Sequence, residues 1–174
     1  MSKFIVIIAG EPESVNSEII AKAWKKLKKN HRKNLIIIGN YKLIKKQLNK
    51  FKIKIPIQEI NSITEVKNKH KLPILNIPLK FKKSFKISKN ENSNYIIRCF
   101  EKAHYLAAKK VINGFINCSI DHRLIPLLRE WDANQMSTNP CYELVELVDE
   151  LFYLRLVSLV SKFSIIILHR HVYV

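Results

Sequence analysis

The 174-residue sequence has few of the residues that turn, break or cross-link a chain: three glycines, six prolines and three cysteines. Cys99, Cys118 and Cys141 form no C-x-x-C pair and are odd in number. We therefore expect reduced thiols in a cytoplasmic protein rather than a disulfide framework. No G-x-G-x-x-G run is present, which argues against the pyrophosphate-binding loop of Rossmann dinucleotide-binding folds.

Long apolar runs are also missing. The run at residues 4–9 is too short for the apolar region of a signal peptide, and an acidic residue follows it closely. The most apolar window, residues 151–168, is interrupted by Arg155, Lys162 and three serines. We expect this window to be buried or to face a partner, and we expect no membrane span.

Acidic residues are scarce, since 31 Lys and Arg oppose 14 Asp and Glu, and the formal net charge is +17. Such a charge suggests nucleic acid or another anionic surface as a partner. The excess belongs entirely to residues 1–125, because residues 126–174 contain four basic and six acidic side chains. The lysines are dispersed and have no regular aromatic interleaving, so we expect solvated faces and do not expect a nucleic-acid groove.

Hydrophobic patterning predicts an α/β fold. The β-branched run at residues 4–9 is typical of a strand buried on both faces, as in a parallel sheet covered by helices. A helix is predicted at residues 17–30, a second strand at 35–38 and a second helix at 41–51. Residues 53–57 are predicted as an edge or irregular strand because they contain a proline. This alternation favours a mostly parallel sheet flanked by helices.

The pattern continues further along the chain. Residues 64–70 are predicted to form a short helical turn, and residues 72–79 are extended because their prolines forbid a helix. A helix is predicted at 92–110, followed by a buried strand at 114–118 that ends in a polar turn. Ser17 and Ser93 are the predicted N-caps of the first and last of these helices.

The residues after the first strand resemble a known family. The segment GEPESVNSE, residues 10–18, is similar to the turn G-[D/E]-P-x-G-[I/V]-G-P-[E/D] of 4-hydroxythreonine-4-phosphate dehydrogenases. The positions that fit are Gly10, Glu11, Pro12, Val15 and Glu18, whereas Ser14, Asn16 and Ser17 replace two glycines and a proline. Residues 93–125 resemble the family's later helix, strand and turn, with His122 standing where a lysine is usual. The resemblance covers residues 1–125, less than half of a usual family member.

This resemblance implies a fold similar to part of the isocitrate and isopropylmalate dehydrogenase-like fold. It also implies NAD and a divalent metal as cofactors, a phosphorylated small-molecule substrate, a homodimer, and a role in vitamin B6 (pyridoxine) biosynthesis. The family's G-H-T-E motif and metal-binding histidines cannot be placed in residues 126–174. We therefore expect two parts, residues 1–125 and a Leu/Val-rich tail at 126–174. A frameshift, a recombined end or a truncated gene would explain the change, and we expect no turnover by the chain alone.

The candidate residues near substrate or cofactor come from the two matched segments: Gly10, Glu11, Pro12, Glu18, Asn117 and His122. They follow predicted strands, at the edge where α/β proteins bind ligands. Each also has a structural explanation, since acidic side chains stabilise a helix N-terminus and a turn histidine is commonly exposed. No catalytic residue is assigned. His169 and His171 would share a strand face but have no third ligand, so no metal site is predicted.

Two functions from other classes stay open. The first is a non-catalytic basic α/β module that binds nucleic acid or another anionic partner through residues 25–90. The second is an interaction protein that uses the apolar helix predicted at residues 142–161 to contact a partner.

Overall fold

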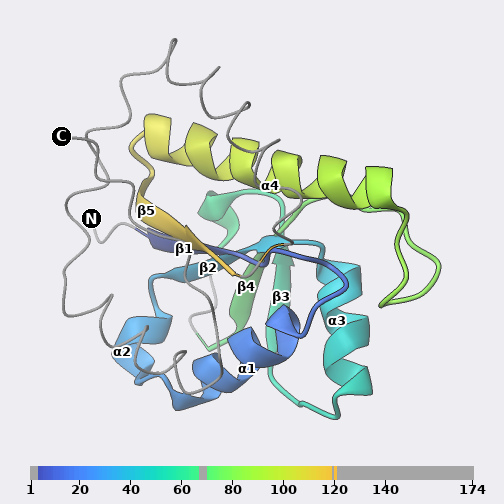
Figure 1. Ribbon diagram of the computed structural model, residues 1–174. Helices are drawn as coiled ribbons and strands as arrows, with labels where there is room; N and C mark the ends of the chain where they lie inside the picture. Colours follow the sequence, from blue (N-terminus) through green and yellow to red (C-terminus); the bar gives the residue numbers. More distant parts are fainter. Residues whose placement is uncertain (1–3, 67–69, 119, 121–174) are drawn as a thin grey trace, which may run out of the picture.

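The computed structural model describes residues 4–66, 70–118 and 120, and these form one parallel sheet with helices on both faces. The strands are β1 (Phe4–Ile8), β2 (Leu35–Gly39), β3 (Ile57–Ile60), β4 (Leu72–Asn76) and β5 (Ile112–Asn117). Their order is β3-β4-β2-β1-β5, and every paired neighbour runs parallel (Figure 1). The predicted α/β class with a parallel sheet flanked by helices is confirmed.

The helices divide between the two faces of the sheet. They are α1 (Asn16–Lys26), α2 (Lys29–Arg32), α3 (Tyr41–Lys50), the 3-10 helix η1 (Ile63–Glu65) and α4 (Lys89–Ala108). Figure 1 shows α4 lying across one face, with α1 and α3 on the other. The connection through α4 carries the chain from β4 past β2 and β1 to β5. β1 therefore pairs with a neighbouring strand on each side, β2 and β5.

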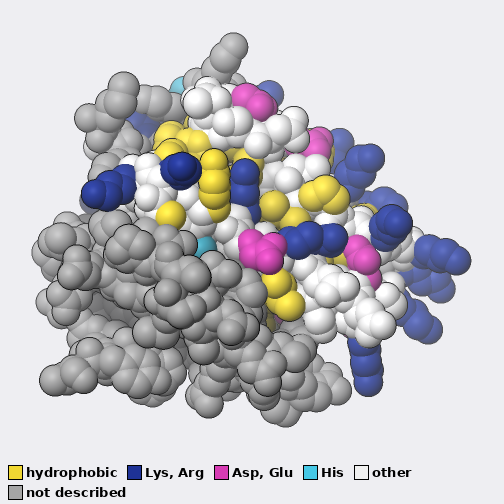
Figure 2. Space-filling view, turned by 90° about the horizontal axis from the view of Figure 1, so that it is seen from above, with side chains coloured by type: hydrophobic (Ala, Val, Ile, Leu, Met, Phe, Trp, Pro, Cys, Tyr) yellow, Lys and Arg dark blue, Asp and Glu magenta, His cyan; other side chains and the backbone are white. Residues whose placement is uncertain are grey.

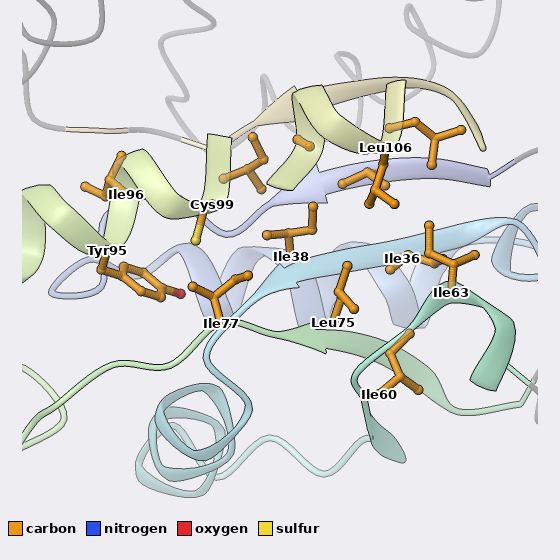
Figure 3. Close-up of a cluster of buried hydrophobic side chains, with 14 residues drawn as sticks. Ile36, Ile38, Ile60, Ile63, Leu75, Ile77, Tyr95, Ile96, Cys99 and Leu106 are labelled. Carbon is orange, nitrogen blue, oxygen red and sulfur yellow. The ribbon is translucent and has the colours of Figure 1, made fainter. Parts of the chain in front are cut away.

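Two hydrophobic clusters hold the layers together. Under α4, the side chains of Tyr95, Ile96 and Cys99 point toward Ile38 of β2 and toward Ile77 (Figure 3). The other cluster combines alternate residues of the same strands with α1 and α3; its buried members include Ile7, Ile37, Ile74, Trp24 and Leu48. Because helices cover both faces of β1 and β2, the side chains on both faces of these strands must be apolar. This explains their unbroken β-branched sequences.

The predicted N-caps of the long helices are wrong. α1 begins at Asn16, so Ser17 lies inside the helix and is buried. The N-cap position is Val15, and no side chain of the described residues caps this helix. The Ser14 hydroxyl closes the turn before it, because it accepts from the Asn16 N–H at 3.1 Å and donates to the Glu11 carbonyl at 2.6 Å. α4 begins at Lys89, and Ser93 donates from within the helix to the Lys89 carbonyl at 3.2 Å. Serine hydroxyls can close several kinds of turn, which is why the sequence alone misplaced them.

Several element boundaries also differ from the prediction. The first predicted helix ends at Lys26 because Leu27 is extended, and α2 follows separately. β3 begins at Ile57, after Pro56 rather than around it; the Pro56 carbonyl accepts from the Leu72 N–H at 2.8 Å where the ladder starts. The predicted edge or irregular strand at residues 53–57 shares only Ile57 with β3, which lies at an edge of the sheet. β5 starts at Ile112, two residues before the predicted strand.

The hydroxyl of Tyr95 gives a direct test of this packing. Tyr95 is 1% exposed, and its oxygen accepts from the Asn40 N–H at 2.8 Å. Tyr95→Phe leaves that buried N–H without this acceptor, so we expect the free energy of unfolding to fall by about 1–3 kcal/mol in urea titrations. Tyr105→Phe is the matched control, since Tyr105 lies on the same helix and is 56% exposed. Equal stability of the two variants would contradict this packing.

Candidate functional site

The carboxyl ends of all five strands meet at one edge of the sheet, the edge where α/β proteins bind ligands. The segments that follow β1, β2 and β4 are joined there by hydrogen bonds. Ala9 donates to the Ile38 carbonyl at 2.9 Å, and Ile77 donates to the Gly39 carbonyl at 3.0 Å. The candidate site is therefore this edge, bounded by the turn after β1 and by the end of β5.

Asn40 organises the part of the edge after β2. It is buried and caps α3, because its side-chain oxygen accepts from the Leu43 N–H at 2.9 Å. Its side-chain nitrogen donates to the Ile77 carbonyl at 2.9 Å. Beside it, the Asn76 side chain accepts from the Tyr41 N–H at 3.0 Å. The two asparagines thus join β2, β4 and α3.

Gly39 permits the close approach of these elements. A Cβ atom at this position would lie 3.0 Å from the Ala9 Cβ and 3.1 Å from the Ile44 Cδ1 atom. A side chain there would therefore push apart the end of β1, β2 and α3. Gly10 serves the same edge in another way, since its φ of 73° lies in the left-handed region that favours glycine. The two glycines place the turn after β1 against α3.

Gln47 of α3 holds the turn after β1 through a side-chain hydrogen bond. Its side chain is 2% exposed, and its nitrogen donates to the Pro12 carbonyl at 2.6 Å and to the Ser84 carbonyl at 3.0 Å. One amide thus joins the turn after β1, the helix after β2 and the loop after β4. Along the sequence, Gln47 lies 35 residues from Pro12 and 37 residues from Ser84. The predicted site residues Gly10 and Pro12 consequently belong to a rigid junction.

The carboxylates of the turn are bound by the chain itself. Glu11 accepts from the Asn92 side chain at the start of α4, and Glu13 accepts from the Ile87 N–H in the preceding loop. Glu18 lies farther along, in the first turn of α1, and forms an ion pair with Lys22 at 2.6 Å. These contacts favour a structural role for the acidic side chains, which is the alternative to a site role that the sequence left open.

The end of β5 lies beside the end of β1. Asn117 pairs with Ile8, and the Cys118 N–H donates to the Ile8 carbonyl at 3.0 Å. The Asn117 side chain is exposed and donates to the Cys118 carbonyl at 3.1 Å. Of the six candidate residues, Gly10, Glu11 and Pro12 thus follow β1, and Asn117 is the last residue of the neighbouring strand β5. His122 lies outside the described residues.

Neither described thiol is suited to nucleophilic attack. Burial raises the pKa of Cys118 to about 12. Burial also raises the pKa of Cys99 to about 12, against the smaller opposing effect of its hydrogen bond with Tyr95. Both groups are therefore protonated at neutral pH, whereas the reactive form of cysteine is the thiolate.

The described residues do not fit the cofactors that the family resemblance implies. Within residues 4–66, 70–118 and 120, no group of three or more His, Cys, Asp or Glu side chains could hold a metal ion. At the turn after β1, Glu11 and Glu13 bring negative charge to the place where a Rossmann fold receives a pyrophosphate. We therefore derive no chemical step through NAD or a metal on these residues.

A surface cavity of about 340 Å³ lies away from this edge. It is lined by the end of α3 and by the segment that leads into β3, including Leu48, Ile53 and Pro56. Pro56 precedes the first residue of β3, so the cavity adjoins the amino end of that strand. It is not part of the candidate site.

No protein-family model and no curated protein matches the sequence. Solved structures do match. A Salmonella typhimurium protein assigned as a 4-hydroxythreonine-4-phosphate dehydrogenase is 19% identical, with a TM-score of 0.63 over 74% of this chain and 41% of its own. The Klebsiella pneumoniae enzyme of that name is 16% identical, with a TM-score of 0.63 over 72% and 40%. The Burkholderia phymatum enzyme is 14% identical, with a TM-score of 0.63 over 72% and 38%.

The described residues share the fold of these dehydrogenases. The resemblance inferred from the sequence is confirmed at the level of the fold. This chain spans about 40% of the length of the dehydrogenases that it matches. No helix in the described part is long and apolar enough to cross a membrane.

Sequence reasoning missed the polar side chains that build this dehydrogenase-like edge. The bonds of Gln47 to the turn after β1 and to the loop after β4 were not predicted. A glutamine at an inward position is itself a signal, because a buried amide needs partners. Asn40 carried a second signal, since asparagine directly before a helix is a preferred N-cap. Asn92 gave none, because its partner lies 81 residues away.

Removing the Gln47 amide tests whether it fixes the junction. Gln47→Met keeps the length of the side chain but leaves the Pro12 and Ser84 carbonyls without this donor. We expect the free energy of unfolding to fall by about 1–3 kcal/mol in urea titrations. Gln58→Met is the matched control, because that half-buried side chain donates one 3.4 Å bond. A loss no larger than the control's would show that Gln47 does not hold the turn.

Proposed function

We propose that this chain is a homologue of 4-hydroxythreonine-4-phosphate dehydrogenases and that its described part provides a substrate-binding edge of the same kind. The observation that carries the proposal is the match of the parallel sheet to three such dehydrogenases, together with the G-E-P turn at the end of β1. The alternative of a general anion-binding module shares the basic charge but does not account for this turn.

The family reaction is the NAD-dependent, metal-assisted oxidation of a phosphorylated hydroxy-amino acid. NAD supplies the hydride acceptor and the metal polarises the reacting oxygen when both are bound. The described residues provide neither a metal-ligand cluster nor a pyrophosphate grip. We therefore assign them a binding and positioning role and propose that the 174 residues alone do not turn over. A cytoplasmic location, expected from the unpaired cysteines, and a homodimer, which the resemblance implies, are part of this proposal.

The exposed end of β5 is the place where these residues offer a polar side chain to a substrate. Asn117 lies at the carboxyl edge beside the end of β1, and its exposed amide has donors to spare beyond its bond to Cys118. Asn40 uses its side-chain oxygen and nitrogen within the fold, and Asn76 uses its side-chain oxygen. We therefore assign the proposed binding role to Asn117, which is the exposed one of these three asparagines.

A titration with 4-phosphohydroxythreonine, followed by nuclear magnetic resonance of the backbone amides, tests this role. We expect shifts at residues 116–118 and a loss of affinity of about tenfold in Asn117→Ala, the size of one hydrogen bond to a charged group. Asn113→Ala is the matched control, an exposed asparagine near the other end of β5. With NAD and a divalent metal added, the same sample should form no NADH.

Three results would count against the proposal. Shifts absent from the carboxyl edge would remove the binding role, and equal losses in the two variants would remove Asn117 from it. Substrate-dependent NADH formation would show that the 174 residues are sufficient for catalysis. The Klebsiella pneumoniae dehydrogenase, assayed alongside, confirms that the substrate and cofactors are competent.

A further inference from the structure

Eleven exposed lysines lie on α3, on the segment after it and on the loop that leads into α4, beside the carboxylates of Glu13 and Glu91. We call this surface the lysine face; its members are Lys42, Lys45, Lys46, Lys50, Lys52, Lys54, Lys80, Lys82, Lys83, Lys86 and Lys89. Neither of its two segments, residues 41–54 and 80–90, contains an Asp or Glu. Figure 2 shows Lys and Arg side chains gathered at the right of the view, on the side where Figure 1 shows this loop.

The two segments are distant in sequence but form one surface. The buried Gln47 amide donates to the Ser84 carbonyl at 3.0 Å, which anchors the loop on α3. The rings of Phe51 and Phe85 pack edge to face with centroids 5.5 Å apart. The loop lysines are therefore held beside the helix lysines, at separations that the sequence does not specify.

Aromatic rings lie among these lysines. The ammonium of Lys50 lies 4.8 Å from the Phe85 ring centroid, that of Lys46 lies 5.1 Å from Phe81, and that of Lys45 lies 5.8 Å from Tyr41. All three rings are half-buried. No regular aromatic interleaving is visible along the sequence, because Phe81 and Phe85 are far from α3 along the chain. Folding brings them together.

The free energy of stacking favours a nucleobase as the partner of each ring over the lysine ammonium that now lies beside it. An exposed ammonium–ring contact contributes about 0.5–1 kcal/mol. A base stacked on an aromatic side chain contributes about 1–3 kcal/mol. When a base takes the ring, the displaced ammonium is free to contact the adjoining phosphate. Lysine binds phosphate as a point charge, without the geometric demands of a bidentate contact.

An anionic membrane fits the lysine face less well. Peripheral membrane binding combines basic charge with large apolar side chains that enter the interface. The exposed large hydrophobic residues of the described part are Val15, Tyr105 and Val111, and none belongs to the lysine face. We propose that the lysine face binds single-stranded nucleic acid, with phosphates on the lysines and bases stacked on Tyr41, Phe81 and Phe85.

Fluorescence anisotropy with labelled oligo-uridylate and oligo-deoxythymidylate, at increasing salt, tests this proposal on the full chain. We expect binding at low salt and a steep linear fall of log K with log salt, because about 0.7 counterions are released per single-strand phosphate contact. Lys46→Gln combined with Lys50→Gln should lower the affinity about tenfold and reduce that slope by about 1.4. Phe81→Leu combined with Phe85→Leu should lower the affinity at an unchanged slope.

The matched control is Lys102→Gln combined with Lys109→Gln. These two lysines also lie over an aromatic ring, that of Tyr105, but on α4 and outside the lysine face. We expect this control to bind like the unchanged chain, and thermal melting confirms that all variants are folded. Absence of oligonucleotide binding at low salt would overturn the proposal, as would an equal loss in the control. Tighter binding to phosphatidylserine vesicles than to either oligonucleotide would assign the face to membranes instead.

Discussion

The parallel pairing of β1 on both of its sides is the constraint on which the rest of the structure depends. β1 pairs with β2 over Ile5–Ile8 and with β5 over the same residues. Its partners begin at residues 35 and 112, and parallel strands need a crossover between them. Helices must therefore cover both faces, and every strand must deliver its carboxyl end to one edge. The short apolar run at the start of the chain thus determines where the candidate site lies.

The chain then uses its own polar groups to close most of that edge. Gln47 binds the carbonyl of Pro12, while Glu11 and Glu13 bind the start of α4 and the loop before it. Acids near a helix N-terminus are ordinary stabilising features, and here they also have specific hydrogen-bond partners. A turn in this position is commonly a ligand-binding loop, and in this chain its polar groups also bind α3, α4 and the loop between them. Asn117, at the end of β5, is an exposed polar residue at the same edge.

The order and type of most elements could be predicted from the sequence, because β-branched runs and amphipathic periodicity are local signals. The boundaries were less predictable, since a serine can cap a helix or close a turn: Ser17 lies inside α1, and Ser14 closes the turn before it. The start of β3 depended on a bond from Leu72 to the carbonyl of Pro56, which is again non-local. The candidate site and the lysine face depend on contacts across 35 to 81 residues, and no local pattern contains them.

The turn after β1 is held by groups of this chain, and we propose that it does not receive the pyrophosphate of a dinucleotide. The decisive experiment is to titrate the isotopically labelled chain with NAD while following the backbone amides of residues 10, 11, 13 and 14. We expect these amides not to shift, because Gln47, Asn92 and the Ile87 N–H hold the turn in both conditions. Saturable shifts centred on Gly10 and Glu11, with release of the Gln47 amide, would contradict it.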